Sequence, residues 1–404
     1  MAEMKPSVLY ISYTGILDPL GESQVLQYVI GLSKKHKMVL LTFEKPEALK
    51  DEQQLSELKR TCSDAGVEWH YHHYHRRPNL PATFYDLLVG IFTGTQLARR
   101  HEIDIVHCRS YLAGLMGLAV KRLTGTCHIF DMRGFWPDER VDGGVWTKAS
   151  LRYRLFKRLE RTLLLGTDYV VSLTRSGVTE LTKFDYLEDR DLKVSVIPTC
   201  TNLQLFSPVE ETRPSAGSGF VMGYVGSAGS WYMFDQVAKA VKQLFDQLPE
   251  SRFLVLNKGG HTEILRHLES EDVDISRVEL KSVPYQEVSQ HIACMTAGIS
   301  FIKPAWSKRA SSPTRLGEFL ACGKPLLANA GVGDVESDLL SSGTGVVIKG
   351  FSDEELSAAL ASIIELVSDP ELGVRCRETA ERQFSLQAGV EEYSSIYLRL
   401  EDKR

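Results

Sequence analysis

The residues whose types and spacing point most directly to chemistry lie in the segment SSPTRLGEFLACGKP, residues 311–325. Ser312 is a favourable N-cap, Pro313 suits the first helical position and Gly323 is typical of a helix end, so the segment predicts a short helix. The first turn of a helix carries unpaired backbone N–H groups and the positive end of the helix dipole. A phosphate group binds well at such a position.

Charged side chains surround the start of this predicted helix. Lys308 and Arg309 precede it, Thr314 lies in its first turn, and Arg315 and Glu318 are three residues apart on one side. A cation suited to phosphate and a carboxylate suited to sugar hydroxyls can therefore face the same way. The spacing alone allows an ordinary ion pair on a solvated helix face equally well.

The composition describes an ordinary globular protein that is long enough for two domains. The 404 residues exceed what one hydrophobic core usually organises, and 43% of them are hydrophobic and 25% charged. A net charge of −5 argues against a nucleic-acid partner. Seven cysteines without a C-x-x-C pair favour a reducing compartment, and no run is apolar enough to span a bilayer, so we expect a cytoplasmic protein.

Short apolar runs alternate with longer amphipathic segments, a pattern typical of βα units in parallel sheets. In the first half we expect strands near 7–12, 38–43, 67–71, 103–107, 128–131, 169–173 and 194–197. In the second half we expect them near 220–225, 252–256, 278–280, 298–302, 325–328 and 345–348. The polar stretch 210–219 is the predicted linker. The predicted fold class is α/β, with two doubly wound, Rossmann-like domains.

These elements divide the chain into three parts. We predict an N-terminal domain over 1–205, a C-terminal domain over 206–385 and an amphipathic terminal helix within 386–404. Ligands of parallel sheets collect at the carboxyl ends of the strands. The chemistry is therefore expected in a cleft that the two domains face.

A glycine-rich turn opens the second domain directly after its first predicted strand. Gly226 and Ser227 begin this turn, and glycine lets a ligand approach the backbone closely. Lys258 follows the next predicted strand, where a cleft residue belongs. A solvated loop lysine is the alternative for Lys258.

The first domain also carries charged residues at the ends of predicted strands. Asp131 and Arg133 follow one strand, and Arg109 follows its neighbour in the sequence. Charged residues crowded at the carboxyl end of a strand are rarely there for core packing, so they are candidates for ligand contacts. A buried pair of Asp131 and Arg133 that braces the loop is the alternative.

The segment 311–325 resembles the donor-site helix of glycosyltransferase family 4, where two glutamates separated by seven residues precede a small residue, Gly and Pro. Glu318 and the Ala-Cys-Gly-Lys-Pro that follows are similar to the second half of this motif, while Ala310 stands in the place of the first glutamate. The Ser-Pro-Thr-Arg-x-x-Glu version resembles bacterial surface-polysaccharide and O-antigen members. The resemblance implies a GT-B fold whose C-terminal helix crosses back to the first domain. It also implies that Glu318 accepts hydrogen bonds from the hydroxyls of the nucleotide ribose.

Other segments extend this resemblance over the chain. Residues 18–25 resemble the family's glycine loop, which implies that Gly21 lies near the nucleotide sugar and Glu22 near the acceptor. Residues 196–202 are similar to its interdomain hinge. Most relatives carry an arginine where Ser227 stands, so other cations must compensate the donor phosphates. The candidates are Lys258, Arg309 and Arg315.

The resemblance implies a retaining glycosyltransferase that moves a sugar from a nucleotide-diphosphate sugar to a glycan, lipid-linked or small-molecule acceptor. It implies no cofactor and no metal. The donor site comprises Gly21, Gly226, Ser227, Lys258, Arg309, Ser312, Pro313, Thr314, Arg315 and Glu318; the acceptor side comprises Glu22 and Arg109; the catalytic candidates are Asp131, Arg133 and Glu318. Ala310, Ser227 and Tyr232 keep one alternative open, a catalytically silent GT-B subunit that binds a partner or sugar nucleotide without transfer. A second alternative is a nucleotide-sugar epimerase, which shares the fold.

Two further segments bear on partners. Residues 70–77, HYHHYHRR, contain no cysteine or carboxylate that would complete a metal site, so we interpret them as a polar loop. Residues 146–165 are basic and rich in aromatic residues. They form either an ordinary solvated helix or a helix that binds an anionic membrane, which would place the protein at the inner face of that membrane.

Overall fold

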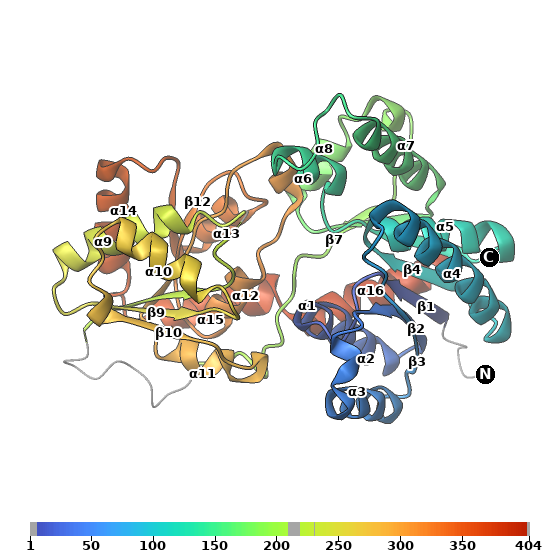
Figure 1. Cartoon of the computed structure of the whole chain (residues 1–404), viewed down its shortest axis with the longest axis horizontal. Coiled ribbons are helices and arrows are strands. Elements are labelled where there is room, and N and C mark those ends of the chain that lie inside the picture. The colour runs from blue at the N-terminus through green and yellow to red at the C-terminus, as the bar shows by residue number, and fades with distance from the viewer. Residues whose placement is uncertain (1–5, 209–218, 230, 402–404) are drawn as a thin grey trace. The chain divides into compact units, whose positions relative to one another are not determined.

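The computed structural model describes residues 6–208, 219–229 and 231–401 of the chain (Figure 1). It forms two compact units: unit 1 is Met1–Pro198 with Leu386–Arg404, and unit 2 is Thr199–Ser385. The boundary between the two units therefore lies between Pro198 and Thr199, whereas the sequence analysis predicted it between residues 205 and 206. The predicted linker over 210–219 lies outside the described residues except for Gly219.

Unit 1 is built on one seven-stranded sheet with the order β3-β2-β1-β4-β5-β6-β7, in which all neighbouring strands are parallel. The strands are β1 (Ser7–Ser12), β2 (Lys37–Glu44), β3 (Glu68–His73), β4 (Ile105–Arg109), β5 (Cys127–Asp131), β6 (Tyr169–Ser172) and β7 (Val194–Val196). Each strand expected in this half of the chain is present. The strand order reverses between β1 and β4, and doubly wound sheets bind ligands at such a switch point.

Helices cover both faces of this sheet. They are α1 (Pro19–Gly21), α2 (Gln27–Ser33), α3 (Glu52–Asp64), α4 (Asn79–Arg100), α5 (Ser110–Thr124), α6 (Trp136–Asp142), α7 (Leu151–Gly166) and α8 (Arg175–Leu181), with a π-helical turn over Glu22–Leu26. Short 3-10 turns lie at Ala48–Lys50 and Asp185–Leu187. In the part of the chain that the structure describes, no helix is both long and apolar enough to cross a bilayer.

The C-terminal helix α16 (Leu386–Glu401) belongs to the core of unit 1, and Figure 1 shows it, in red, beside the blue helix α2. The hydroxyl of Tyr393 donates to Asp131 Oδ2 at 3.1 Å, and the Tyr397 hydroxyl lies 2.7 Å from Nδ1 of His107. Both tyrosines are buried. The prediction that the last helix returns to the first domain is therefore confirmed.

Unit 2 repeats the plan with a six-stranded parallel sheet in the order β10-β9-β8-β11-β12-β13. Its strands are β8 (Val221–Val225), β9 (Arg252–Leu256), β10 (Val278–Lys281), β11 (Ala297–Ser300), β12 (Leu326–Asn329) and β13 (Gly345–Ile348). Its helices are α9 (Phe234–Gln247), α10 (His261–Ser270), α11 (Val288–Ala293), α12 (Thr314–Ala321), α13 (Val335–Ser342), α14 (Asp353–Leu366) and α15 (Leu372–Gln383). Short 3-10 turns lie at Ile275–Arg277, Tyr285–Glu287 and Trp306–Ala310.

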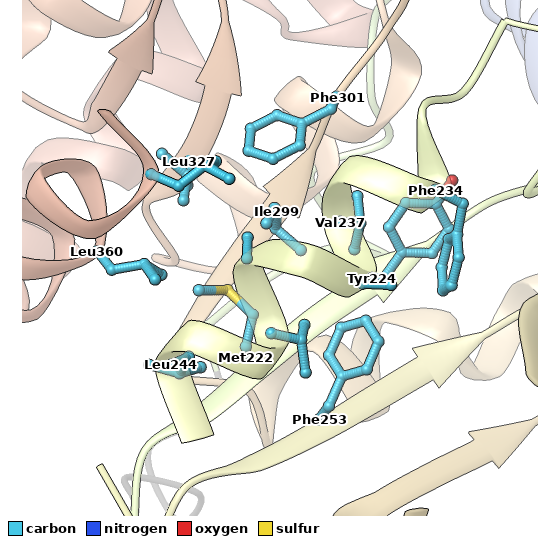
Figure 2. Packing of buried hydrophobic residues seen from close by; sticks show 14 of the residues in the cluster. Met222, Tyr224, Phe234, Val237, Leu244, Phe253, Ile299, Phe301, Leu327 and Leu360 are labelled. Carbon is cyan, nitrogen blue, oxygen red and sulfur yellow. The ribbon is translucent and has the colours of Figure 1, made fainter. Parts of the chain in front are cut away.

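The core of unit 2 explains why this sheet forms. Figure 2 shows Phe234, Val237 and Leu244 of α9 directed toward Met222 of β8 and Phe253 of β9. The apolar residues of α9 recur with the helical period, so one side of the helix is apolar and packs on the sheet. The carboxyl ends of the strands are thereby fixed as a rigid platform for the loops that follow them.

Candidate active site

Helix α12 begins one residue later than predicted, and its N-cap is Pro313 rather than Ser312. The Ser312 hydroxyl instead accepts a hydrogen bond from the Thr199 N–H at 3.1 Å, and the Ser312 carbonyl accepts one from Thr199 Oγ1 at 2.8 Å. The prediction of a serine cap is wrong because the neighbouring chain segment competes for that hydroxyl. No side chain caps α12, which starts at the half-buried Thr314. Its first N–H groups are therefore suited to an external anion.

The end of α12 agrees with the sequence analysis. Gly323 has a φ of +74°, which is the left-handed region that glycine favours. The N–H of Lys324 donates to the Phe319 carbonyl at 2.9 Å, as expected where a glycine terminates a helix. The helix and both its flanks are thus held in a defined position.

Arg315 and Glu318 form an ion pair on α12, with Arg315 Nη1 donating to Glu318 Oε2. Glu318 is fully buried and the Arg315 side chain is 30% exposed, so the pair does not lie on a solvated helix face. Burial raises the pKa of Glu318. Burial alone would lower the pKa of Arg315, but the adjacent carboxylate raises it. Oε1 of Glu318 has no hydrogen-bond partner among the described residues, so a hydroxyl donor would satisfy it.

The turn after β8 leaves open space beside its glycine. Gly226 has a φ of +145°, and a Cβ at this position would meet no atom within 4 Å. Asn257, at the end of β9, donates through Nδ2 to the Gly226 carbonyl at 2.7 Å and accepts from the Gly260 N–H at 2.5 Å. Ser227 is exposed and its carbonyl accepts from the Tyr224 hydroxyl at 2.5 Å. The sequence analysis missed Asn257, although a polar residue directly after a buried strand was a usable signal.

The predicted cations of unit 2 lie in different environments. Lys308 is buried, and its ammonium group lies 4.0 Å from the centre of the Trp231 ring. Arg309 and Lys258 are exposed. Ala310 is fully buried, so this position supplies no carboxylate. Arg315 is the predicted cation that the structure places beside Glu318.

In unit 1 the loop after β1 is held by a carboxylate that the sequence analysis missed. Glu44, the last residue of β2, is fully buried and accepts hydrogen bonds from the N–H groups of Ile16 at 2.8 Å and Leu17 at 3.1 Å. The Thr42 hydroxyl donates to it at 2.6 Å. Burial raises the pKa of Glu44. An acidic residue that ends an apolar strand was the signal that could have indicated this role.

Gly21 lies where this loop folds back on itself. It is buried, and a Cβ at this position would lie 1.8 Å from the carbonyl oxygen of Gly15. Glu22 follows at the start of the π-helical turn and is half-buried. The structure therefore gives Gly21 a steric role in the loop, whichever ligand the loop meets.

We expect Gly21→Ala to lower the free energy of unfolding by about 2–3 kcal/mol, because the methyl group would force the Gly15 backbone away. Urea unfolding followed by circular dichroism measures this change. Gly373→Ala is the matched control, since its Cβ would lie 3.6 Å from the nearest atom, an ordinary contact. Equal stability of the Gly21 variant and the control would contradict the close packing.

Asp131 and Arg133 meet at the end of β5 in a buried cluster. Asp131 Oδ2 lies 3.8 Å from Arg133 Nη1, and Arg133 Nη2 donates to Gln24 Oε1 at 3.4 Å, which joins the strand end to the loop that contains Gly21. Asp131 is 1% exposed. Burial alone would raise the pKa of Asp131, but the Arg133 guanidinium, together with His107 and Arg109, outweighs burial and lowers this pKa. Burial and the contact with Gln24 fit the bracing alternative, and Asp131 Oδ1 is left without a hydrogen-bond partner among the described residues.

Arg109 lies beside Asp131 in the parallel register of β4 and β5. Burial and then repulsion from Arg133 lower the pKa of Arg109. Unlike Asp131 and Arg133, it lines a cavity at the carboxyl edge of the sheet. Arg109 is only 7% exposed, so it contributes to the wall of this cavity as a largely buried guanidinium.

A cavity of about 590 Å³ lies at the carboxyl edge of the unit 1 sheet, beside the switch point between β1 and β4. Tyr13, Tyr74, Trp136, Trp146 and Phe156 are aromatic residues of its lining. Its cations are Lys45, Arg76, Arg109, Arg140 and Arg152. Asp18 is the one acid among the described lining residues, and it is ion-paired with Lys45. The cavity therefore carries an excess of positive charge.

The aromatic wall of this cavity is a packed cluster. The ring of Trp136 lies 4.9 Å from that of Phe156 and 5.4 Å from that of Trp146, between ring centres. Trp146 and Phe156 are stacked at 5.3 Å, and Arg140 lies 5.2 Å from the Trp136 ring. The sequence analysis grouped Trp146 and Phe156 in one aromatic segment but did not predict that Trp136 packs against them, because α6 and α7 bring these rings together only in the folded unit.

The histidine segment 70–77 differs from its prediction. Its first half belongs to β3, an edge strand, rather than to a polar loop. His70 Nε2 and His101 Nε2 lie 2.8 Å and 3.3 Å from Glu68 Oε1, and these three residues are a group among the described ones whose ligand atoms are close enough to hold a metal. The group lies at the amino end of β3, opposite the cavity, so it is not part of the candidate active site.

Comparisons with known proteins agree with this architecture. Residues 22–199 match the family model described as a glycosyl transferase 4-like domain. No curated protein matches the chain. Among solved structures, sucrose-phosphate synthase from Thermosynechococcus elongatus has a TM-score of 0.76 at 14% identity, with 99% of this chain and 100% of that chain covered.

Two further solved structures cover nearly the whole chain. Anabaena HepE in complex with UDP-glucose has a TM-score of 0.69 at 13% identity and covers 97% of this chain and 99% of its own. WaaG, a glycosyltransferase involved in lipopolysaccharide biosynthesis, has a TM-score of 0.66 at 16% identity and covers 96% and 99%. At such identities these likenesses show the fold. Residues 22–199 are thus a glycosyl transferase 4-like domain, and the two parallel sheets of the chain have the GT-B fold.

Proposed function

We propose that the chain transfers a sugar from a nucleotide-diphosphate sugar, bound in unit 2 at α12, to an acceptor bound in the cavity of unit 1. The observation that carries the proposal is the Arg315–Glu318 pair on a helix without a side-chain cap. Glu318 is fully buried and its Oε1 lacks a partner among the described residues. A buried carboxylate oxygen of this kind is costly unless a donor such as a ribose hydroxyl reaches it.

The donor phosphates would lie at the first turn of α12. The N–H groups of this turn and the Arg315 guanidinium supply positive charge, and the open space beside Gly226 allows a close approach to the backbone. Lys258 and Arg309 are the additional cations of this proposal, and Ser227 contributes no charge. Because a similar protein, HepE, is known in complex with UDP-glucose, uridine nucleotides are the first donors to test.

The main catalytic contribution would be stabilisation of the leaving phosphate. Negative charge builds on this group as the glycosidic bond breaks, and cations that are already in place stabilise it without reorganisation. We propose that the reaction retains the anomeric configuration without a protein nucleophile and without a metal. Transfer that persists in the presence of EDTA would support the last point, and complete loss would overturn it.

On the acceptor side we propose an anionic, sugar-bearing molecule. The cavity of unit 1 has five cations against one acid, which favours phosphate or carboxylate groups. Its tryptophan and tyrosine rings offer flat apolar surfaces with polar edges, which suit a sugar. A similar protein, WaaG, acts in lipopolysaccharide biosynthesis, so polysaccharide precursors are the acceptors to test first.

A thermal-shift screen of UDP, GDP, CMP and dTDP, alone and as sugar conjugates, tests the donor site. A nucleotide at one hundred times its dissociation constant should stabilise the chain by about 2.7 kcal/mol. Stabilisation by one base that disappears in Arg315→Ala would support the proposal, and no response to any nucleotide would overturn it. Binding without transfer or donor hydrolysis would identify a silent subunit, while conversion of the donor sugar without an acceptor would identify an epimerase.

A further inference from the structure

Helix α4 presents an uninterrupted apolar face to solvent. Five large side chains of this face are 49–64% exposed: Leu80, Phe84, Tyr85, Leu88 and Phe92. Leu80, Phe84, Leu88 and Phe92 are each four residues apart and Tyr85 is next to Phe84, which places all five along one side of the helix. Asp86, the one charged residue between Arg77 and Arg99, is 1% exposed because it bonds Tyr13 and His75. The exposed side is therefore free of charge over about four turns.

The opposite side of α4 is fixed against α5. A Cβ at Gly90 would lie 2.5 Å from the Met116 sulfur, and one at Gly94 would lie 3.1 Å from a Val120 methyl group. This close packing holds the orientation of the helix, so its apolar face cannot turn inward. Monomeric proteins rarely expose contiguous apolar patches of this kind without a binding role.

The apolar face begins at the rim of the cavity in unit 1. Arg76, Leu80 and Thr83 line that cavity on the α4 side. Val145 and Arg152 line it on the α7 side, where Val145 is 63% exposed. Leu151 and Leu155 of α7 are also exposed, at 81% and 54%. Exposed apolar residues therefore flank the cavity on both sides.

Positive charge accompanies these apolar residues. Arg76 and Arg77 precede α4, and Arg99 and Arg100 end it. Helix α7 starts at Leu151, after the expected 146, and the exposed cations of this region are Lys148, Arg152, Arg154, Arg158 and Arg161. Glu160, the acid of α7, is fully buried. This face is thus basic in a chain whose net charge is −5.

We infer that the apolar face of α4 and the basic start of α7 together dock on an anionic phospholipid surface, which brings the cavity of unit 1 to the level of the headgroups. Apolar side chains that enter the interface and cations that contact anionic headgroups are the two contributions to such binding. The inference rests on the proposed function in one respect, the acceptor, which would reach the cavity from the membrane. A symmetric contact between two copies is disfavoured because it would bring these like charges together.

Vesicle flotation of the full chain, without any sugar nucleotide, tests the docking. We expect the protein to float with vesicles of phosphatidylcholine and phosphatidylglycerol in equal parts, and not with phosphatidylcholine alone. Phe84→Glu with Phe92→Glu should weaken binding by about tenfold or more, since two phenylalanines that would enter the bilayer interface are lost. Arg152→Ala should weaken it about fivefold. The matched control is Leu340→Glu with Val374→Glu, two exposed apolar residues of unit 2 at 55% and 54%.

Three results would overturn the inference. One is the absence of flotation with anionic vesicles, and another is equal flotation of the Phe84/Phe92 variant and the control. The third is a dimer of the wild type in lipid-free light scattering that the Phe84/Phe92 variant abolishes, which would assign the α4 face to a second copy. Retained nucleotide binding by the Phe84/Phe92 variant separates a docking defect from failure of the donor site. Vesicle binding by Glu318→Ala separates failure of the proposed transfer from failure of docking.

Discussion

Glu318→Ala should lower kcat/KM for sugar transfer by about 10²–10³-fold. The variant removes the buried oxygen that we assign to the ribose, and it leaves Arg315 without the carboxylate that holds its guanidinium beside the start of α12. A misplaced cation at the leaving phosphate costs transition-state stabilisation as well as donor affinity. Steady-state transfer assays with the donor found by the nucleotide screen measure the loss.

Glu318→Gln separates this loss from a folding defect. Burial raises the pKa of Glu318, so its ionised form is unfavourable in the folded state and an amide of the same size removes that cost. Arg315 is 30% exposed and can be hydrated in the variant. We expect a change in unfolding free energy within about 1 kcal/mol and a large loss of transfer. Glu336→Ala, at a surface glutamate paired with Lys349, is the control that should keep full activity. Wild-type kcat/KM in both Glu318 variants would contradict the assignment.

Asp131→Ala should lower the free energy of unfolding by about 3–5 kcal/mol. Asp131 is the buried carboxylate opposite Arg133 and beside Arg109, so its removal leaves two buried guanidinium groups without compensation. Urea unfolding measures the loss. Tyr393→Phe removes a single hydrogen bond to the same carboxylate and should cost about 1 kcal/mol. If Asp131→Ala kept its stability but lost transfer, the residue would act on a substrate rather than brace the loop.

The same residue predicts a pH dependence with a definite sign. The pKa of Asp131 is lower in the folded chain than in the unfolded one, mainly because of Arg133. Its contribution to stability is therefore complete above the ordinary aspartate pKa of about 3.9, and it is lost as the pH falls through the lower folded-state pKa. The stability difference between wild type and Asp131→Ala should narrow in that acidic range.

Much of the fold could be predicted because its signals are local. The apolar run of each strand and the helical period of segments such as Phe234–Gln247 report burial from a few neighbouring residues. All strands of both sheets were expected near the positions where they occur. The segment around α12 was recognisable for the same reason, since Arg315, Glu318 and Gly323 lie within one short helix and its end.

The sequence by itself thus determined the two parallel sheets, the helix that carries the Arg315–Glu318 pair and the family resemblance. Only the tertiary structure decided which groups interact across long stretches of chain. Examples are the hydrogen bond from the Tyr393 hydroxyl to Asp131 and the one from the Thr199 N–H to the Ser312 hydroxyl. It also decided that Glu318 is buried and that the apolar face of α4 is exposed. Periodicity shows that a helix has an apolar side, but whether a neighbour covers that side depends on how the elements pack, which no local pattern contains.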